Sequence, residues 1–113
     1  MRNRYTVGVM SVRNEDLPPL NPLIRPATTA DIPIIAGFNV QLAQQTESLQ
    51  LDPDRVRAGV EAMLADPARG LYFVAEHEGE VIGQLCLTTE WSDWRNGWFW
   101  WIQSLFVKEA FRG

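Results

Sequence analysis

Cysteine and lysine are nearly absent from this chain of 113 residues, in which Cys86 and Lys108 are the single examples of each. A lone cysteine excludes an internal disulfide, which favours a reducing compartment. Because Cys86 lies in an apolar run, we predict a buried, unreactive thiol. Basic clusters are also lacking and the net charge is −4. Both facts argue against nucleic acid as a partner, because proteins that bind it present a basic face.

Long apolar runs are missing as well. No stretch approaches the ~20 residues needed to span a bilayer, and residues 5–10 are too short and polar for the apolar part of a signal peptide. We therefore expect a cytoplasmic protein with no membrane partner. The lone His77 has no cysteine or aspartate cluster at ligand spacing, so no metal site is predicted.

The composition that is present, 46% hydrophobic and 21% charged, is typical of one globular domain. The proline-rich stretch 17–22 cannot be helical, so residues 1–22 are predicted to form an N-terminal extension or linker. The domain is then expected over residues 23–113. Either Met1 or Met10 would serve as a start.

Hydrophobic periodicity predicts an α+β fold with the order strand, two helices, then three antiparallel strands. The first helix is expected between caps at 28–31 and about Gln45, and the second between Asp52-Pro53 and Asp66-Pro67. The strands are predicted at residues 23–27, 71–77, 80–89 and 98–107, with a tight turn at Glu78-Gly79 and a loop over 90–97.

This order and three local sequences resemble the first half of the GNAT acetyltransferase fold. Residues 24–28 followed by Asp31 are similar to that family's opening strand and helix cap, and residues 76–83 to its next hairpin. Residues 102–113 resemble its fourth strand leading into the cofactor loop, whose pattern is Arg/Gln-x-x-Gly-x-Gly/Ala. Arg112 fits the first letter and Gly113 follows, so the chain ends inside this motif. We expect a fragment, a truncated product, or a chain completed by a partner.

The resemblance implies direct transfer of an acetyl group from acetyl-CoA to a primary amine of a small molecule or peptide. In that family the main chain of the bulged fourth strand orients the thioester. This role would fall here to Leu105, Phe106 and Val107, which could equally be plain core residues. Arg112 and Gly113 would begin the loop that holds the pyrophosphate at a helix N-terminus.

An amine acceptor must lose a proton, which costs about 4–5 kcal/mol at pH 7 for an ordinary alkylamine. Glu90 is the candidate base, with Asp93 and Glu47 as acidic residues near the presumed acceptor, although each could be a solvated surface acid. Polyamine acetyltransferases carry acids where this chain has Gln103 and Ser104. Since glutamine is no base, catalysis near Gln103 is expected to use water relays, and polyamine specificity is disfavoured.

Five tryptophans fall between residues 91 and 101. They could pack against the helices, form a cation–π cage for the acceptor, or lie at a subunit interface, and we expect burial on at least one strand face. Trp91 and Trp94 are the candidate substrate-binding members. A second hypothesis is a catalytically inert module that forms a homodimer through the exposed strand 98–107.

Overall fold

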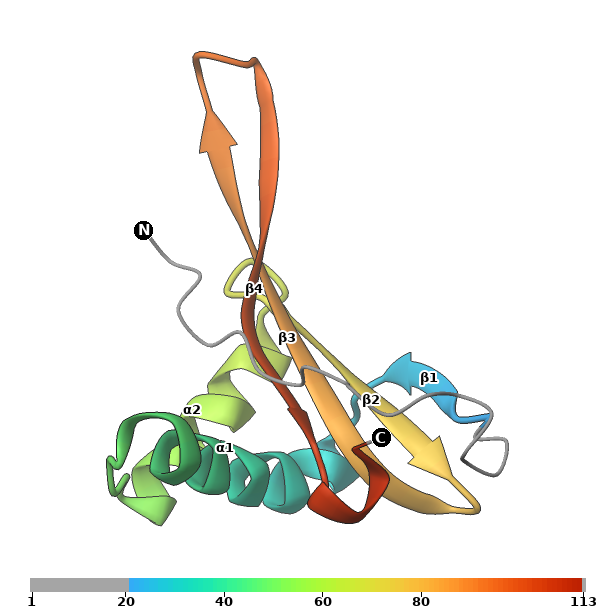
Figure 1. Ribbon diagram of the computed structural model, residues 1–113. Coiled ribbons are helices and arrows are strands. Elements are labelled where there is room, and N and C mark those ends of the chain that lie inside the picture. The colour runs from blue at the N-terminus through green and yellow to red at the C-terminus, as the bar shows by residue number, and fades with distance from the viewer. Residues whose placement is uncertain (1–20, 113) are drawn as a thin grey trace.

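The computed structural model describes residues 21–112, so the predictions for residues 1–20 and for Gly113 lie outside the described residues. The predicted order of elements is confirmed (Figure 1). The elements are β1 (Leu23–Pro26), α1 (Ile32–Glu47), α2 (Pro53–Ala65), β2 (Leu71–His77), β3 (Glu80–Ser92) and β4 (Gly97–Val107), with short 3-10 turns at Thr29–Asp31 and Glu109–Phe111.

The helix boundaries follow from the predicted caps. The backbone N–H of Thr28 donates to Asp31 Oδ2 at 2.7 Å just before α1. Asp52 Oδ1 accepts from the backbone N–H of Asp54 at 3.0 Å, which caps α2. Helix α2 stops before Pro67, because a proline disfavours helical backbone in the residue preceding it.

The four strands form one antiparallel sheet in the order β1-β2-β3-β4. Strand β4 is therefore an edge strand, with β3 as its one neighbour in the described part of the chain. Both helices cover the same face of the sheet (Figure 1). No helix within residues 21–112 is long and apolar enough to cross a membrane.

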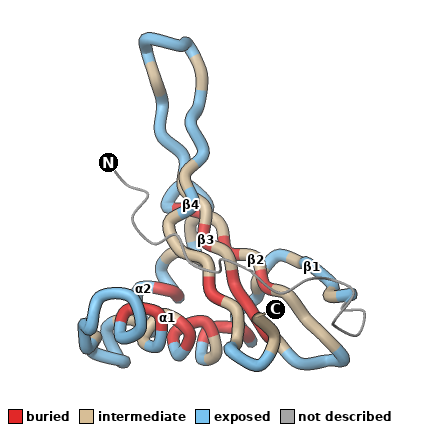
Figure 2. Tube along the Cα trace, viewed as in Figure 1, coloured by how far each residue is buried: buried red, intermediate tan, exposed pale blue. Residues whose placement is uncertain are grey.

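The core lies between the helices and alternate residues of the strands, because successive strand side chains point to opposite faces. Tyr72, Val74, Cys86 and Phe106 are buried under the helices (Figure 2). The rings of Phe38 in α1 and Phe106 in β4 pack with centroids 4.8 Å apart. The opposite face of the sheet is half-buried.

The predicted loop over residues 90–97 is wrong, because β3 and β4 continue into it. Glu90 and Trp91 lie within β3, and the loop shrinks to residues 93–96. The result is a two-stranded arm that projects from the body of the molecule (Figure 1). Cross-strand aromatic pairing stabilises it, as shown by the Trp91 and Trp98 rings, whose centroids lie 5.2 Å apart.

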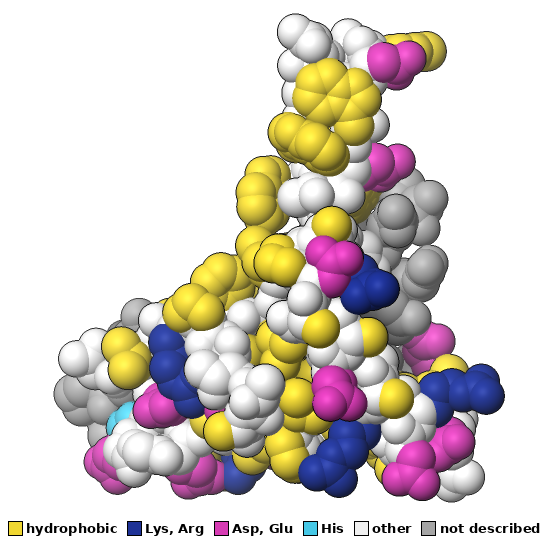
Figure 3. Space-filling view, turned by 180° about the vertical axis from the view of Figure 1, so that it is seen from behind, with side chains coloured by type: hydrophobic (Ala, Val, Ile, Leu, Met, Phe, Trp, Pro, Cys, Tyr) yellow, Lys and Arg dark blue, Asp and Glu magenta, His cyan; other side chains and the backbone are white. Residues whose placement is uncertain are grey.

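The expectation that tryptophans are buried on at least one strand face is also wrong. Trp98 and Trp100 are 63% and 60% exposed, and Trp101 on the other face is only half-buried. Trp100 pairs with Thr89, whose side chain points away from the face that holds Cys86, so both exposed tryptophans lie on the face opposite the helices. The arm is largely exposed (Figure 2). Seen from behind, apolar side chains follow the arm down to the body of the sheet (Figure 3).

A β-bulge interrupts β4 where it leaves the arm. Ile102 pairs with Leu87 and Ser104 pairs with Cys86, so Gln103 is an extra residue on β4. A bulge of this kind bends the strand and redirects the side chains beside it.

Candidate active site

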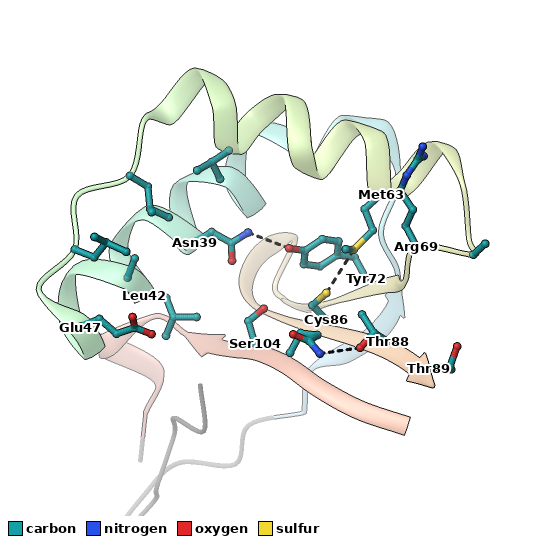
Figure 4. A pocket seen from close by; sticks show the side chains of 16 residues that line it. Asn39, Leu42, Glu47, Met63, Arg69, Tyr72, Cys86, Thr88, Thr89 and Ser104 are labelled. Carbon is teal, nitrogen blue, oxygen red and sulfur yellow. Dashed lines mark hydrogen bonds between the residues drawn. The ribbon is translucent and has the colours of Figure 1, made fainter. Parts of the chain in front are cut away.

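A cavity of about 580 Å³ lies between the two helices and the sheet (Figure 4). Its lining residues come from α1, the segment joining the helices, α2, the turn after α2, and the three long strands. The side chains used below are Asn39, Glu47, Met63, Arg69, Tyr72, Cys86, Thr88, Gln103 and Ser104.

The bulge brings Gln103 and Ser104 to the same cavity, although neighbours in a regular strand point to opposite faces. Gln103 Nε2 donates to Thr88 Oγ1 at 2.8 Å, which orients the amide. Its Oε1 has no donor among residues 21–112. Gln103 therefore offers a carbonyl oxygen that can accept an N–H group from a ligand.

A buried polar network supports the floor of the cavity. Gln84, 3% exposed, donates through Nε2 to Asn39 Oδ1 at 3.1 Å and to Ser104 Oγ at 3.3 Å. Asn39 Nδ2 in turn donates to Tyr72 Oη at 2.9 Å. Because the phenol oxygen accepts from Asn39, its own O–H is left to donate towards its neighbours Cys86 and Ser104, with which Tyr72 also interacts.

Burial controls the ionisation of the two acidic groups beneath the cavity. It raises the pKa of the Tyr72 phenol well above the usual range, and it raises the pKa of the Cys86 thiol to about 11. Both groups are therefore neutral at pH 7. Cys86 is buried as predicted, and its Sγ lies 3.5 Å from Met63 Sδ.

The free edge of β4 lies beyond the bulge. Lys108 donates its backbone N–H to Ile82 O at 2.8 Å. Peptide groups alternate in direction along an antiparallel strand, so Phe106 faces β3, whereas Leu105 and Val107 face the free edge. Arg112 Nε donates to Val107 O at 2.6 Å, which agrees with this direction.

The candidate catalytic and substrate-binding residues are divided between two places. Glu47 and Gln103 line the cavity. Trp91 and Glu90 lie on the arm, Asp93 and Trp94 lie at its tip, and none of the four lines the cavity. Glu90 Oε1 accepts from Trp101 Nε1 at 2.9 Å.

The residues of the site that were not predicted include Asn39 and Arg69, which line the cavity, and Gln84, which lies in the polar network beneath it. Asn39 and Gln84 carried a signal, because each is a polar residue at a position where the helical or strand period places an apolar one. Ile35 and Leu42 flank Asn39 on the apolar stripe of α1. Arg69 carried none, because it lies in the turn after α2, where an arginine is ordinarily solvated.

The acetyltransferase (GNAT) family model matches residues 38–113, about two thirds of the chain. The chain therefore belongs to the GNAT family of acetyltransferases, as the sequence resemblance implied. No curated protein matches it significantly. No group of three or more metal-ligating side chains occurs within residues 21–112.

Solved structures agree with this assignment. A possible acetyltransferase from Clostridium difficile 630 is 45% identical with a TM-score of 0.77; the match covers 83% of this chain and 61% of that one. This chain thus spans less than two thirds of that protein's length. A predicted acetyltransferase from Clostridium acetobutylicum with acetyl-CoA is 17% identical with a TM-score of 0.67, covering 82% and 64%. The aminoglycoside N-acetyltransferase AAC(6')-Iy with CoA is 17% identical with a TM-score of 0.64, covering 84% and 60%. The last two show the likeness of fold alone.

Proposed function

We propose that this chain contributes the acceptor cavity and the thioester-facing strand of an enzyme that transfers an acetyl group from acetyl-CoA to a primary amine. The observation that carries the proposal is the bulge at Gln103. It turns two polar side chains into the cavity and leaves the peptide groups of Leu105 and Val107 on the free edge. One strand therefore contacts the acceptor with side chains and the donor with its backbone.

The free edge fits the extended, amide-containing arm of acetyl-CoA. The N–H groups of Leu105 and Val107 have no partner within residues 21–112, and an extended ligand can pair with such an edge as another strand would. Acetyl-CoA supplies an acetyl thioester there. A backbone N–H aimed at the carbonyl oxygen would stabilise the charge that develops on it by about 3–4 kcal/mol.

The cavity residues would orient the amine and remove its proton. Gln103 Oε1 can hold one N–H of the amine and so direct the nitrogen lone pair towards β4. We propose that the proton leaves through water that contacts Ser104 and reaches Glu47 at the cavity end. Glu90, on the arm, remains a candidate base for an acceptor that extends beyond the cavity.

Isothermal titration with acetyl-CoA tests donor binding, and release of free CoA thiol tests transfer to a panel of amines. The buried Cys86 gives this thiol assay a low background. Gln103→Leu is expected to lower kcat at least about tenfold, while the exposed Gln41→Leu on α1 leaves it unchanged. No binding of acetyl-CoA at high micromolar concentration would sink the proposal.

A second candidate is an assembly role through the β4 edge. Trp98, Trp100 and Ile102 are exposed on an edge strand, and an unpaired apolar edge is a template for pairing with another chain. We propose that two copies associate there. Light scattering should give a dimer mass that Ile102→Lys shifts to the monomer, and a wild-type monomer at high concentration would exclude this role.

A further inference from the structure

Two opposite charges line the cavity. Glu47 and Arg69 are the charged side chains among its lining residues, and the others are apolar or neutral polar. The two lie at opposite ends of the cavity (Figure 4). We propose that the acceptor is dipolar: an amine that also carries a carboxylate, as in an amino acid, with the carboxylate at Arg69 and the amine on the Glu47 side. This inference rests on the proposed acetyl transfer and names its acceptor class.

One nitrogen of the Arg69 guanidinium is hydrogen-bonded, and the other two can still donate to a ligand. Arg69 Nη1 donates to the backbone oxygen of Ala62 at 3.0 Å, which ties the guanidinium to the last turns of α2. Asp66 Oδ2 lies 3.8 Å from the same nitrogen and forms an exposed ion pair with Arg69, at a distance too long for a hydrogen bond. Nε and Nη2 have no partner within residues 21–112. These two N–H donors form the fork that binds a carboxylate through both oxygens.

Glu47 lies at the opposite end of the cavity from Arg69 and carries the opposite charge (Figure 4). It is the last residue of α1, it is exposed, and its carboxylate has no hydrogen bond to the described residues. An ammonium group approaching this end would find an unpaired carboxylate. The neutral acceptor Gln103 Oε1, which belongs to the same cavity lining, can then hold the deprotonated amine.

The same charges disfavour a polycation. A polyamine needs an anionic partner for each ammonium group, and this cavity supplies one carboxylate and an arginine. The second ammonium of a diamine would therefore lie near Arg69 and be repelled. If a carboxylate replaces that ammonium and the methylene chain of the ligand is kept the same length, the repulsion becomes an attraction.

Two matched pairs of probes test this directly: 6-aminohexanoate against 1,5-diaminopentane, and 4-aminobutanoate against 1,3-diaminopropane. Within a pair the methylene chain is identical and one end differs in charge. Binding to the full chain is measured by titration calorimetry without acetyl-CoA. We expect the amino acid of at least one pair to bind about tenfold more tightly than its diamine.

Variants then show which residue causes the preference for the amino acid over the diamine. Arg69→Gln should reduce it to about twofold or less, and Arg69→Glu should reverse it, whereas the exposed Arg55→Gln on α2, outside the cavity lining, leaves it unchanged. Glu47→Gln should weaken the binding of the amino acid and of the diamine equally, because both carry an ammonium group.

The inference is overturned if neither probe binds at millimolar concentration, if wild type prefers the diamine or does not discriminate, or if Arg69→Gln keeps the preference. Failure of the proposed reaction is distinguishable. A chain that prefers the amino acid probes but transfers no acetyl group to them would retain the dipolar site and lose the transferase assignment.

Discussion

Asp31 offers the sharpest test of how the fold holds the cavity-bearing helix α1 in place. Asp31 is 4% exposed, and its carboxylate accepts from Arg25 Nη1 at 2.8 Å, from Arg25 Nη2 at 3.0 Å and from the backbone N–H of Thr28 at 2.7 Å. Asp31→Asn keeps the shape but replaces one oxygen with an NH₂ group. That group would face donors, so at least one bond is lost and the charge attraction disappears.

The expected loss follows from these contacts. Each charge-assisted bond contributes about 1.5–3 kcal/mol, and breaking a buried pair costs about 3–5 kcal/mol. Arg25 is only partly buried and stays paired with Glu76 at 2.7 Å, which reduces the loss. We therefore expect Asp31→Asn to lower the free energy of unfolding by about 3 kcal/mol, and Tm by roughly 15 °C for a domain of this size.

Urea unfolding followed by far-UV circular dichroism measures this change. Tryptophan fluorescence is unsuitable because the tryptophans lie on the arm rather than in the core. The exposed Asp54→Asn on α2 is the matched control and should stay within about 0.5 kcal/mol of wild type. A loss below about 1 kcal/mol for Asp31→Asn would refute the reasoning.

The pH dependence provides a second check on the same residue. The hydrogen bonds from Arg25 lower the pKa of Asp31 below its ordinary value. The stabilisation is therefore complete above the unfolded pKa of about 3.9 and is lost as the pH falls through the folded pKa. The difference between wild type and Asp31→Asn should narrow below about pH 4, and a widening would contradict the assignment.

Three further predictions concern the strands. Phe106→Ala removes a buried ring and should cost about 3–5 kcal/mol by urea unfolding; less than 1 kcal/mol would contradict its place in the core. At Gly83 a Cβ would lie 2.9 Å from the backbone oxygen of Phe106, so Gly83→Ala should cost at least about 1 kcal/mol, while Gly37→Ala, with open space around it, is tolerated or stabilising. Because burial raises the pKa of Cys86 to about 11, iodoacetamide at pH 8 should alkylate the native thiol far more slowly than the thiol in urea, and equal rates by mass spectrometry would refute this.

Local sequence signals were sufficient to predict the helices and the inner strands. The cap at Asp31, the Asp52-Pro53 start and the Glu78-Gly79 turn each act within a few residues, so the sequence predicts where those elements begin and end. The arm could not be predicted in this way. Glu90 and Trp91 pair with residues across a hairpin, and strand propensity depends on such cross-strand partners more than on the residue itself.

The candidate site was predicted in part. Glu47 and Gln103 were both proposed from sequence and meet at one cavity, although they are far apart along the chain. Arg69 was missed because its importance comes from the position of the turn after α2, which depends on how the two helices pack. A charged residue on a turn can contribute to ligand binding only when the packing of the helices places it beside a cavity.

The position of the bulge at Gln103 could not be predicted from the residues of β4, although the family resemblance implied a bulged strand. Within residues 98–107 nearly every side chain is apolar or aromatic, so the alternation that normally reveals strand direction is absent. The pairings show the break: Trp101 lies opposite Thr88 and Ser104 lies opposite Cys86, and Thr88 and Cys86 share a face. Trp101 and Ser104 therefore also share a face, although they are an odd number of residues apart. A regular β4 that continued the register of the arm would place Ser104 on the opposite face, and the peptide groups of Leu105 and Val107 would then point towards β3.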